Sequence, residues 1–309
     1  MEHSVPSVQA PPPTERVAIF GAHSQIAHFL LSGLARQGHR VLALHRQRRP
    51  DSGGDAPGIT WKRYSPDNLA DVLRPGSGLQ RAIHLAPLNT LPDILPTLAN
   101  AGVRRLIAFG STSTAYKQAS GDHAERNLIT RIAAAEQDIA ERCTRLGIQW
   151  TLFRPTLTYG CGMDGNVAFI ARFIRRFGFF PLVGAGPGLR QPVHAEDLAQ
   201  ACLLALANSA TYSKSYDLSG GSTLAYREMV AEVFRALGRK ARMPEIPLSL
   251  YRAALNWLRL LPGLRNLSPE MADRMNLDLC FDHAGATRDF GYRPRPFTLD
   301  ELALRARSD

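Results

Sequence analysis

Short apolar runs alternate with amphipathic stretches in the first part of the chain. Residues 17–20 form an apolar run that ends at Gly21, and residues 40–44 form another one just after Gly38. Between these runs, apolar side chains recur at helical spacing: Ile26, Phe29, Leu30 and Leu34. The pattern predicts a strand, a turn, a helix and a second strand, which together make one βαβ unit of about 30 residues.

The alternation continues further along the chain. We expect four more strands and two more helices: strands near 59–63, 80–85, 103–109 and 148–153, and helices near 90–101 and 123–146. Strands that alternate with helices form parallel sheets that are covered on both faces. The predicted fold class is therefore α/β, with a doubly wound parallel sheet.

The rhythm changes after Pro155. Only a short extended piece around 191–193 separates the next helical stretches, which lie near 165–176, 195–207, 225–237 and 247–260. We predict a disordered, proline-rich tail at residues 1–14. Two structured parts follow: a dinucleotide-binding core at 15–160 and a smaller, mostly helical C-terminal subdomain at 161–309 that is interleaved with the core.

The composition is that of a compact protein, with 45% hydrophobic and 21% charged residues. No apolar run approaches the roughly 18 residues of a membrane-spanning helix, and the N-terminus lacks the order of a signal peptide, so we expect a cytoplasmic location. The cysteines form no CxxC pair. We interpret them as reduced core thiols and predict no metal site.

The chain is basic, with a formal net charge of +10. Such a balance suits nucleic acid, an anionic membrane surface or a phosphorylated ligand. No zinc finger, RNA-binding aromatic motif or basic zipper accompanies the charge. We therefore predict no nucleic-acid partner and leave the other two classes open.

The turn after the first strand is a candidate phosphate-binding loop. It reads GAHSQIA over residues 21–27, and Ser24 and Ala27 stand where a dinucleotide-binding turn has its second and third glycines. Both are small, so a pyrophosphate can still approach the amides at the helix N-terminus. The candidate cofactor residues here are Gly21, His23, Ser24, Gln25 and Ile26; an ordinary strand-turn-helix is the alternative.

The end of the second strand indicates which nicotinamide cofactor fits. An acidic residue there would bind the ribose hydroxyl of NAD, whereas this chain has His45 and then Arg46. A guanidinium suits the 2′-phosphate of NADP, so we predict NADP in preference to NAD, with Arg46 as its partner. We interpret Arg48 and Arg49 as part of a solvated basic loop.

The order of motifs resembles the extended and atypical short-chain dehydrogenases, the superfamily that includes NAD(P)-dependent epimerases and dehydratases. The similarity covers residues 16–297. It is carried by VAIFGAHSQIA, GVRRLIAFGSTSTAY, GIQWTLFRPTLTYG and GLRQPVHAEDLAQA. The resemblance implies a Rossmann-like sheet that binds NAD(P) and a C-terminal subdomain on the substrate side.

The resemblance also implies roles for residues at the strand ends. Thr112 matches the hydroxyl residue that bonds the reacting oxygen, with Ser111 as its reserve. Tyr116 is a further catalytic candidate, although it also matches a common structural aromatic residue. Three residues are implied at the cofactor, namely Ala86, Pro155 and Thr156.

The superfamily's Tyr and Lys pair, four residues apart on a helix, is missing from this sequence. Alignment on the stretch Ala133 to Glu136 puts Leu128 at the Tyr position and Ile132 at the Lys position. Two apolar side chains cannot move a proton. This departure puts dehydrogenase chemistry in doubt without excluding it.

Two residues match positions that contact substrate in the superfamily. Asn166 opens a helix, where it is a substrate contact or a helix cap, and Arg190 matches the arginine that meets the diphosphate of a sugar nucleotide. The preferred interpretation is an epimerase, dehydratase or reductase that acts on a nucleotide-sugar or similar phosphorylated small molecule. The alternative is a non-catalytic dinucleotide-binding scaffold, assembly or sensor protein of the same fold.

Two stretches combine apolar and basic residues, 169–180 and 248–261. Either one is an amphipathic core helix or a contact with a membrane or a protein partner. Proteins of the superfamily often pair through long helices, so the resemblance also implies a homodimer through the helix that begins near His123.

Overall fold

The computed structural model describes residues 15–46, 56–116, 123–251, 253, 274–299 and 304. Within these ranges the main sheet has seven strands in the order β11-β6-β5-β4-β1-β2-β3, and every neighbouring pair is parallel. The strands are β1 (Arg16–Phe20), β2 (Arg40–His45), β3 (Ile59–Arg63), β4 (Leu79–His84), β5 (Arg105–Phe109), β6 (Gln149–Pro155) and β11 (Lys214–Leu218). The predicted doubly wound, Rossmann-like sheet is confirmed.

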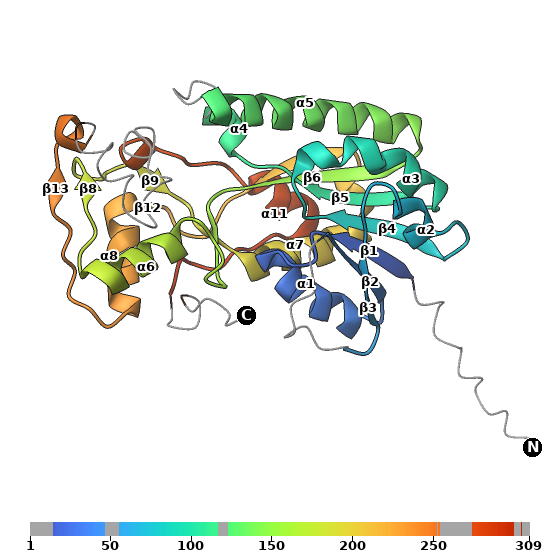
Figure 1. Ribbon diagram of the computed structural model, residues 1–309, viewed down its shortest axis with the longest axis horizontal. Helices are drawn as coiled ribbons and strands as arrows, with labels where there is room; N and C mark the ends of the chain where they lie inside the picture. The colour runs from blue at the N-terminus through green and yellow to red at the C-terminus, as the bar shows by residue number, and fades with distance from the viewer. Residues whose placement is uncertain are drawn as a thin grey trace, which may run out of the picture.

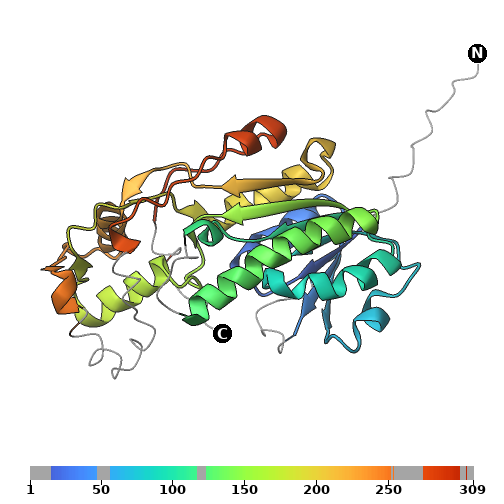
Figure 2. The ribbon, with the colours of Figure 1, turned by 90° about the horizontal axis from the view of Figure 1, so that it is seen from above.

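Helices cover both faces of this sheet (Figure 1). One face carries α2 (Leu69–Leu73), α3 (Leu95–Asn100) and the long α5 (His123–Arg145), and the other carries α1 (Gln25–Arg36), α7 (Ala195–Leu206) and α11 (Ala284–Phe290). Figure 2, seen from above, shows α5 lying along the sheet. Two hydrophobic cores result, one on each face, which explains why β1, β2 and β5 read as nearly continuous apolar runs.

The helices α1 and α7 pack closely on one face of the sheet. A Cβ atom added at Gly33 of α1 would lie 2.9 Å from Cδ1 of Leu203 in α7. The two helices therefore approach at a position where only glycine fits without a shift of the leucine. This contact fixes α1, and with it the turn that precedes α1, relative to the sheet.

A second unit extends from the carboxyl end of the sheet, at the left of Figure 1. Its core lies between α6 (Val167–Phe177) and α8 (Tyr226–Ala236). Three short strand pairs complete it: β7 (Thr158–Tyr159) with β10 (Val193–His194), β9 (Leu189–Arg190) with β12 (Leu224–Ala225), and β8 (Leu182–Val183) with β13 (Glu245–Ile246).

The chain crosses between the two units more than once. After β10 it returns to the main sheet as α7, η3 (Ser209–Thr211) and β11, and α11 also packs there. The proposed division at residue 160 is thus a division in sequence between interleaved segments. No helix among the described residues is long and apolar enough to cross a bilayer.

Some elements differ from the sequence-based expectation. The single helix predicted over 90–101 is divided into η1 (Leu88–Thr90), η2 (Pro92–Ile94) and α3, because Pro92 and Pro96 lack the amide that a continuous helix needs. Strand β11 was not predicted. The stretch expected as a helix at 247–260 lies mostly outside the described residues.

The prediction of four core thiols was partly wrong. Cys143, Cys161 and Cys202 are buried, as expected, whereas Cys280 is exposed. It lies between Leu279, which pairs with Arg190 of β9, and the half-buried Phe281, in a segment that passes beside β9 of the second unit rather than through a core.

Candidate functional site

The strands β1 and β4 are neighbours in the sheet, and the helices that follow them cover opposite faces. The chain therefore opens a crevice at their carboxyl ends, which is where doubly wound sheets bind ligands. A cavity of 310 Å³ lies there. Its lining residues lie at the carboxyl ends of β1, β2, β3 and β4: Gly21, Ala22, His23, Ser24, His45, Arg46, Tyr64, Leu85, Ala86 and Pro87.

Gly21 is required by this close approach of two strands. Its φ of +73° favours glycine, and an added Cβ would lie 2.7 Å from the amide nitrogen of Ala86 and 2.8 Å from the carbonyl carbon of Leu85. Gly21 and Ala86, which sequence reasoning had assigned separately to the cofactor, thus face each other across the crevice.

Ser24 caps the helix that begins at this turn. Its hydroxyl accepts a hydrogen bond of 3.2 Å from the amide of Ala27, and its φ of −69° needs no glycine. The hydroxyl therefore points back into the helix. The amides of Gln25 and Ile26, at the first two helical positions, have no acceptor within the helix and are available to an anion.

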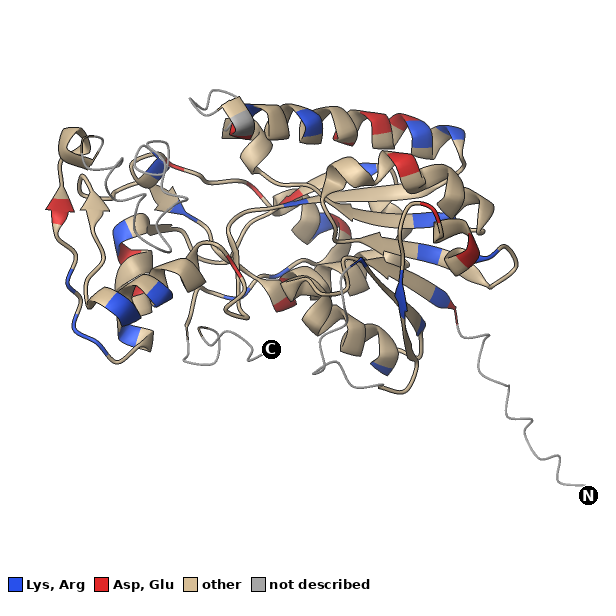
Figure 3. Ribbon diagram, in the orientation of Figure 1, with Lys and Arg blue, Asp and Glu red and all other residues tan. Residues whose placement is uncertain are grey.

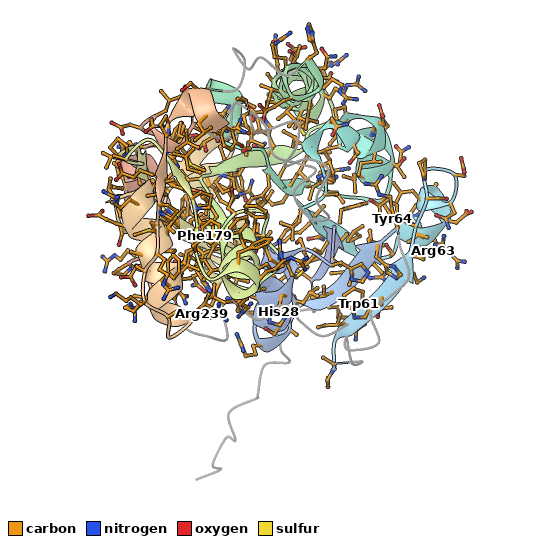
Figure 4. All side chains as sticks on the ribbon, turned by 60° about the vertical axis from the view of Figure 1, so that its left-hand side comes forward. His28, Trp61, Arg63, Tyr64, Phe179 and Arg239 are labelled. Carbon is orange, nitrogen blue, oxygen red and sulfur yellow. The ribbon has the colours of Figure 1, made fainter. Side chains whose placement is uncertain are left out.

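His23 packs away from the turn, against aromatic neighbours. Its ring stacks on Trp61, with centroids 5.4 Å apart, and meets His45 edge-on at 5.1 Å. Burial, and then the neighbouring His45, lower the pKa of His23, so its ring stays neutral at neutral pH. Trp61 and Tyr64 lie on the β3 side of the molecule, where Figure 4 labels them.

The residues of this cavity fit a dinucleotide. The side chains of Ser24 and His23 leave the cavity open, and Arg46 lines it at the end of β2. Seven buried side-chain nitrogen or oxygen atoms among the described residues have no hydrogen-bond partner, and two of them, Nε2 of His23 and Oε1 of Gln25, belong to the turn before α1 and to its first residue. Unpaired polar atoms at the rim of a cavity are typical of a ligand site.

A second cavity, of 390 Å³, lies at the carboxyl ends of β5 and β6, between the two units. It is lined by Ser111, Thr112, Ser113, Tyr116, Thr156, Leu157, Thr158, Asn166, Arg190, Gln191, Tyr226, Arg274, Met275, Leu279 and Phe281. Six residues that the sequence pointed to are brought together here: Ser111, Thr112, Tyr116, Thr156, Asn166 and Arg190.

The hydroxyls at the end of β5 are engaged with the backbone. Thr112 is almost fully buried and donates to the carbonyl of Pro155 at 3.1 Å, and its amide donates to the same oxygen at 3.2 Å. Ser111 accepts from the amide of Ser113 at 3.1 Å, at the start of α4 (Ser113–Tyr116). Pro155 therefore holds Thr112 in place, while Thr156 donates to the carbonyl of Gln191.

Tyr116 contributes one of the two phenols that line this cavity. Burial raises the pKa of Tyr116, and the nearby Arg274 and Arg190 oppose that shift only in part. The phenol therefore stays protonated at neutral pH. In that form it can donate a hydrogen bond or a proton, but it cannot act as a base.

Arg190 lies at the cavity wall but is largely tied to the backbone. Its guanidinium donates to the carbonyls of Leu189 at 2.7 Å and Leu277 at 2.6 Å, and also to that of Arg274. It also lies over the ring of Tyr226, 5.5 Å from the centroid. A buried cation held only by neutral groups leaves its charge available to an anion in the cavity.

Asn166 is free of the capping role that the sequence left open. The carboxylate of Asp164 takes that role, because its Oδ1 accepts from the amides of Asn166 at 2.9 Å and Ala168 at 3.0 Å. Among the described residues the side chain of Asn166 makes no capping bond. It therefore lines the cavity with both its donor and its acceptor available.

Leu128 and Ile132 lie on α5, and neither is among the residues that line this cavity. Leu128 is 42% exposed, and Ile132 packs against the core on that face of the sheet. The helix is fixed by Glu136, whose carboxylate pairs with Arg154 of β6 at 2.7 Å. Neither Leu128 nor Ile132 can transfer a proton.

Sequence reasoning missed several residues of the larger cavity, above all Tyr226 and Arg274. Arg274 lies more than 80 positions after Arg190 in the chain, and no motif surrounds it. Only the return of the C-terminal segment across the cavity puts these residues there. An arginine or a tyrosine with no motif around it is too common in a sequence to indicate a site residue.

Comparison with known proteins supports this architecture. Residues 88–218 match the model of the NAD dependent epimerase/dehydratase family. A 2-alkyl-3-oxoalkanoate reductase of Stenotrophomonas maltophilia is 24% identical, over 91% of this chain and 95% of its own length. The protein y4nG of Sinorhizobium fredii is 28% identical over 52% of this chain, and the match spans only 40% of that relative's length.

Solved structures share the fold. MoeE5 in complex with UDP-glucuronic acid and NAD superposes with a TM-score of 0.68 at 20% identity, covering 91% of this chain and 94% of MoeE5. An NADPH-dependent quinone oxidoreductase of Escherichia coli superposes with a TM-score of 0.67 at 20% identity, covering 93% of this chain and 97% of that one.

The fold is a Rossmann-type parallel sheet with two cavities at its carboxyl edge, and residues 88–218 are similar to the NAD dependent epimerase/dehydratase family. The resemblance inferred from the sequence to the extended and atypical short-chain dehydrogenases is thereby confirmed.

Proposed function

We propose that this protein binds NADP(H), in preference to NAD(H), and acts on a nucleotide-sugar or similar phosphorylated small molecule. The observation that carries the proposal is the single cavity lined by the Gly21 turn, Ala86 and Arg46. It joins a helix N-terminus that suits a pyrophosphate with a guanidinium that suits a 2′-phosphate.

Different residues of the chain bind different parts of the cofactor. The amides of Gln25 and Ile26 bind the pyrophosphate, Arg46 binds the 2′-phosphate, and His23 with His45 closes the adenosine end. Pro155 and Thr156 line the approach from β6 toward the second cavity. A bound nicotinamide supplies hydride transfer. Among the solved structures of this fold, MoeE5 holds NAD and the Escherichia coli quinone oxidoreductase is NADPH-dependent.

The second cavity takes the substrate. Arg190 and Arg274 give it positive charge, and Asn166 and Gln191 offer neutral hydrogen bonds. This mixture suits a phosphorylated sugar, which combines anionic oxygens with hydroxyls. MoeE5, which shares the fold, holds UDP-glucose or UDP-glucuronic acid together with NAD in its structures.

Proton handling differs from that of the superfamily, because Leu128 and Ile132 stand at the Tyr and Lys positions. Tyr116 is the candidate that remains, since its protonated phenol lines the cavity and can donate to a developing oxyanion. Thr112, with Ser111 as its reserve, orients the reacting oxygen in the superfamily's manner.

Thermal unfolding with and without cofactor tests this proposal. NADPH at a hundred times its dissociation constant stabilises a protein by about 2.7 kcal/mol, which raises Tm by several degrees. We expect that rise with NADPH and a smaller one with NADH at the same concentration. No rise with either compound at millimolar concentration contradicts the proposal.

A non-catalytic scaffold or sensor of the same fold is the second candidate. The apolar Leu128 and Ile132 favour it. Conversion of any sugar nucleotide, or steady NADPH oxidation, by the purified protein would eliminate it. A cytoplasmic homodimer paired through α5 completes either candidate, and the mass of the protein in solution tests the pairing.

A further inference from the structure

The second unit ends in a surface that combines exposed cations with exposed aromatic rings. Its members come from the end of α6, the turn after it and the segment after α8: Arg172, Arg175, Arg176, Phe177, Phe179, Arg239, Lys240 and Arg242. We call this surface the α6 patch. Figure 3 shows Lys and Arg gathered over this part of the molecule, and Figure 4 labels Phe179 and Arg239 on the same side.

Helix α6 is amphipathic, with one buried apolar face and one exposed basic face. Val167, Ile170 and Ile174 are buried in the core against α8. Residues at spacings of three and four, which share a face, put Arg172, Arg175 and Arg176 together on the opposite side, and all three are exposed. Of the two interpretations of 169–180, an amphipathic core helix or a contact with a membrane or partner, the helix is present up to Phe177, and its outer face carries only cations and rings.

The segment after α8 joins the same surface. Arg239 donates to the carbonyls of Ile174 at 2.7 Å and Arg175 at 3.3 Å, at the end of α6. The amide of Phe180 donates to the carbonyl of Arg242 at 2.9 Å. The cations of two distant stretches of sequence are therefore held side by side.

Two phenylalanines stand among these cations. Phe177 is 39% exposed and Phe179 is 38% exposed, and both rings rest on Phe173, at 4.6 Å and 5.8 Å between centroids. Arg176 lies over the Phe177 ring at 5.4 Å. Within the described part of the chain, no acidic side chain forms an ion pair with any cation of the patch.

We propose that the α6 patch docks the protein on a membrane surface of anionic lipids. Unpaired cations attract an anionic leaflet, and aromatic rings among them enter the interface between headgroups and acyl chains. A single strand of nucleic acid needs a basic groove with open ring faces. Here Phe173 and Arg176 lie against the Phe177 ring, and neither of the two cavities described above is lined by patch residues.

Co-sedimentation with vesicles tests the proposal on the full chain. We expect binding to vesicles of phosphatidylcholine with phosphatidylglycerol, loss of binding at high salt, and none to phosphatidylcholine alone. Each cation near an anionic leaflet raises affinity about fivefold. The triple variant Arg172→Ala, Arg176→Ala, Lys240→Ala should therefore bind about a hundredfold more weakly.

A matched variant controls for net charge. Arg36, Arg40 and Lys62 are exposed on the sheet unit, and their replacement by Ala removes the same charge. This variant should bind vesicles like the unmodified protein. Equal loss in both triple variants, or no binding to anionic vesicles at low salt, overturns the proposal.

Insertion of the rings has its own readout. A Phe179→Trp variant should be quenched by brominated lipids more strongly than the unmodified protein, whose own tryptophans give the baseline. Quenching no greater than that baseline overturns insertion. If duplex or single-stranded DNA displaces the protein from vesicles, and the patch variant loses DNA affinity rather than lipid affinity, the surface is a nucleic-acid site and the membrane proposal is wrong.

Discussion

Arg274 and Glu125 form an ion pair in which one guanidinium nitrogen, Nη1, lies 3.0 Å from each of the two carboxylate oxygens. The pair joins the C-terminal segment to α5, beside the larger cavity. The side chains are only 19% and 18% exposed, so water screens their attraction weakly. Because the carbonyl of Arg274 accepts from Arg190, the pair also helps to hold the cavity's buried cation.

Loss of this pair should destabilise the protein. Glu125→Gln leaves Arg274 partly buried without its anion, and we expect a loss of about 1–3 kcal/mol in the free energy of unfolding by urea. Glu245→Gln is the matched control, because its partner Arg227 is even nearer, at 2.6 Å, but the side chains are 44% and 51% exposed. That change should cost less than about 1 kcal/mol. Equal costs would contradict the role given to the Arg274 pair.

Gly21 should tolerate no side chain. Gly21→Ala adds the strain of a positive φ, about 1–2 kcal/mol, and a contact of 2.7 Å with the Ala86 amide in the crevice. Gly38→Ala carries the same kind of strain, with φ +83°, but nothing lies within 4 Å of the added atom. Only the Gly21 variant should lose the thermal shift produced by NADPH. A normal NADPH shift in Gly21→Ala would argue that the crevice does not hold the pyrophosphate.

Much of the sheet could be predicted from the sequence, because buried parallel strands are apolar throughout. Strands β1, β2 and β5 are such runs apart from their ends, and the predictions fall within a residue or two of their bounds. The edge strand β11 was missed because its sequence, Lys-Ser-Tyr-Asp-Leu, carries polar residues at three of five positions. A strand with one neighbour needs no continuous apolar run.

The residues of the candidate site also differ in whether the sequence predicts their position. Gly21, Arg46 and Thr112 come within three residues of the ends of predicted strands, so their place at the carboxyl edge follows from the topology alone. Arg274 and Tyr226 reach the cavity only through the tertiary path of later segments. That Asp164 rather than Asn166 caps α6 also depends on side-chain geometry, which no spacing rule contains.

The acid side of the stability profile should depend on His84. This residue of β4 is fully buried, and burial lowers the pKa of His84 from 6.5 to about 3. Below pH 6.5 the unfolded chain therefore binds a proton that the folded chain refuses. Stability is fully present above that pH and is lost as the pH falls toward 3, with a slope that approaches about 1.4 kcal/mol per pH unit.

Replacing His84 removes this titration. His84→Leu should flatten the fall in unfolding free energy between pH 6.5 and pH 4, measured by urea unfolding at several pH values. Its absolute stability at neutral pH can differ, because the 3.4 Å contact with Thr90 is lost. Identical slopes in the variant and the unmodified protein would show that His84 is not the group responsible.

Arg46 should decide between the two nicotinamide cofactors. Arg46→Ala removes a charged hydrogen bond to the 2′-phosphate, worth about 1.5–3 kcal/mol, and so should weaken NADPH binding roughly 10- to 100-fold. NADH, which lacks that phosphate, should bind as before. Arg40→Ala, at the opposite end of β2, should change neither affinity. Calorimetric titration measures all of these, and an equal loss for both cofactors in Arg46→Ala would reject the proposed specificity.

A variant of Tyr116 tests whether the protein is an active enzyme or a non-catalytic scaffold. If its phenol donates the proton in the reaction, Tyr116→Phe should lower turnover by about 10²–10⁴, while the NADPH thermal shift stays unchanged, because Tyr116 lines the larger cavity and not the crevice at Gly21. Tyr226→Phe is the control, since this second phenol also lines the larger cavity but lies under Arg190. Its loss should raise KM more than it lowers kcat. Turnover that survives in Tyr116→Phe but disappears in Thr112→Ala would transfer the proton-donating or orienting role to the hydroxyl at the end of β5.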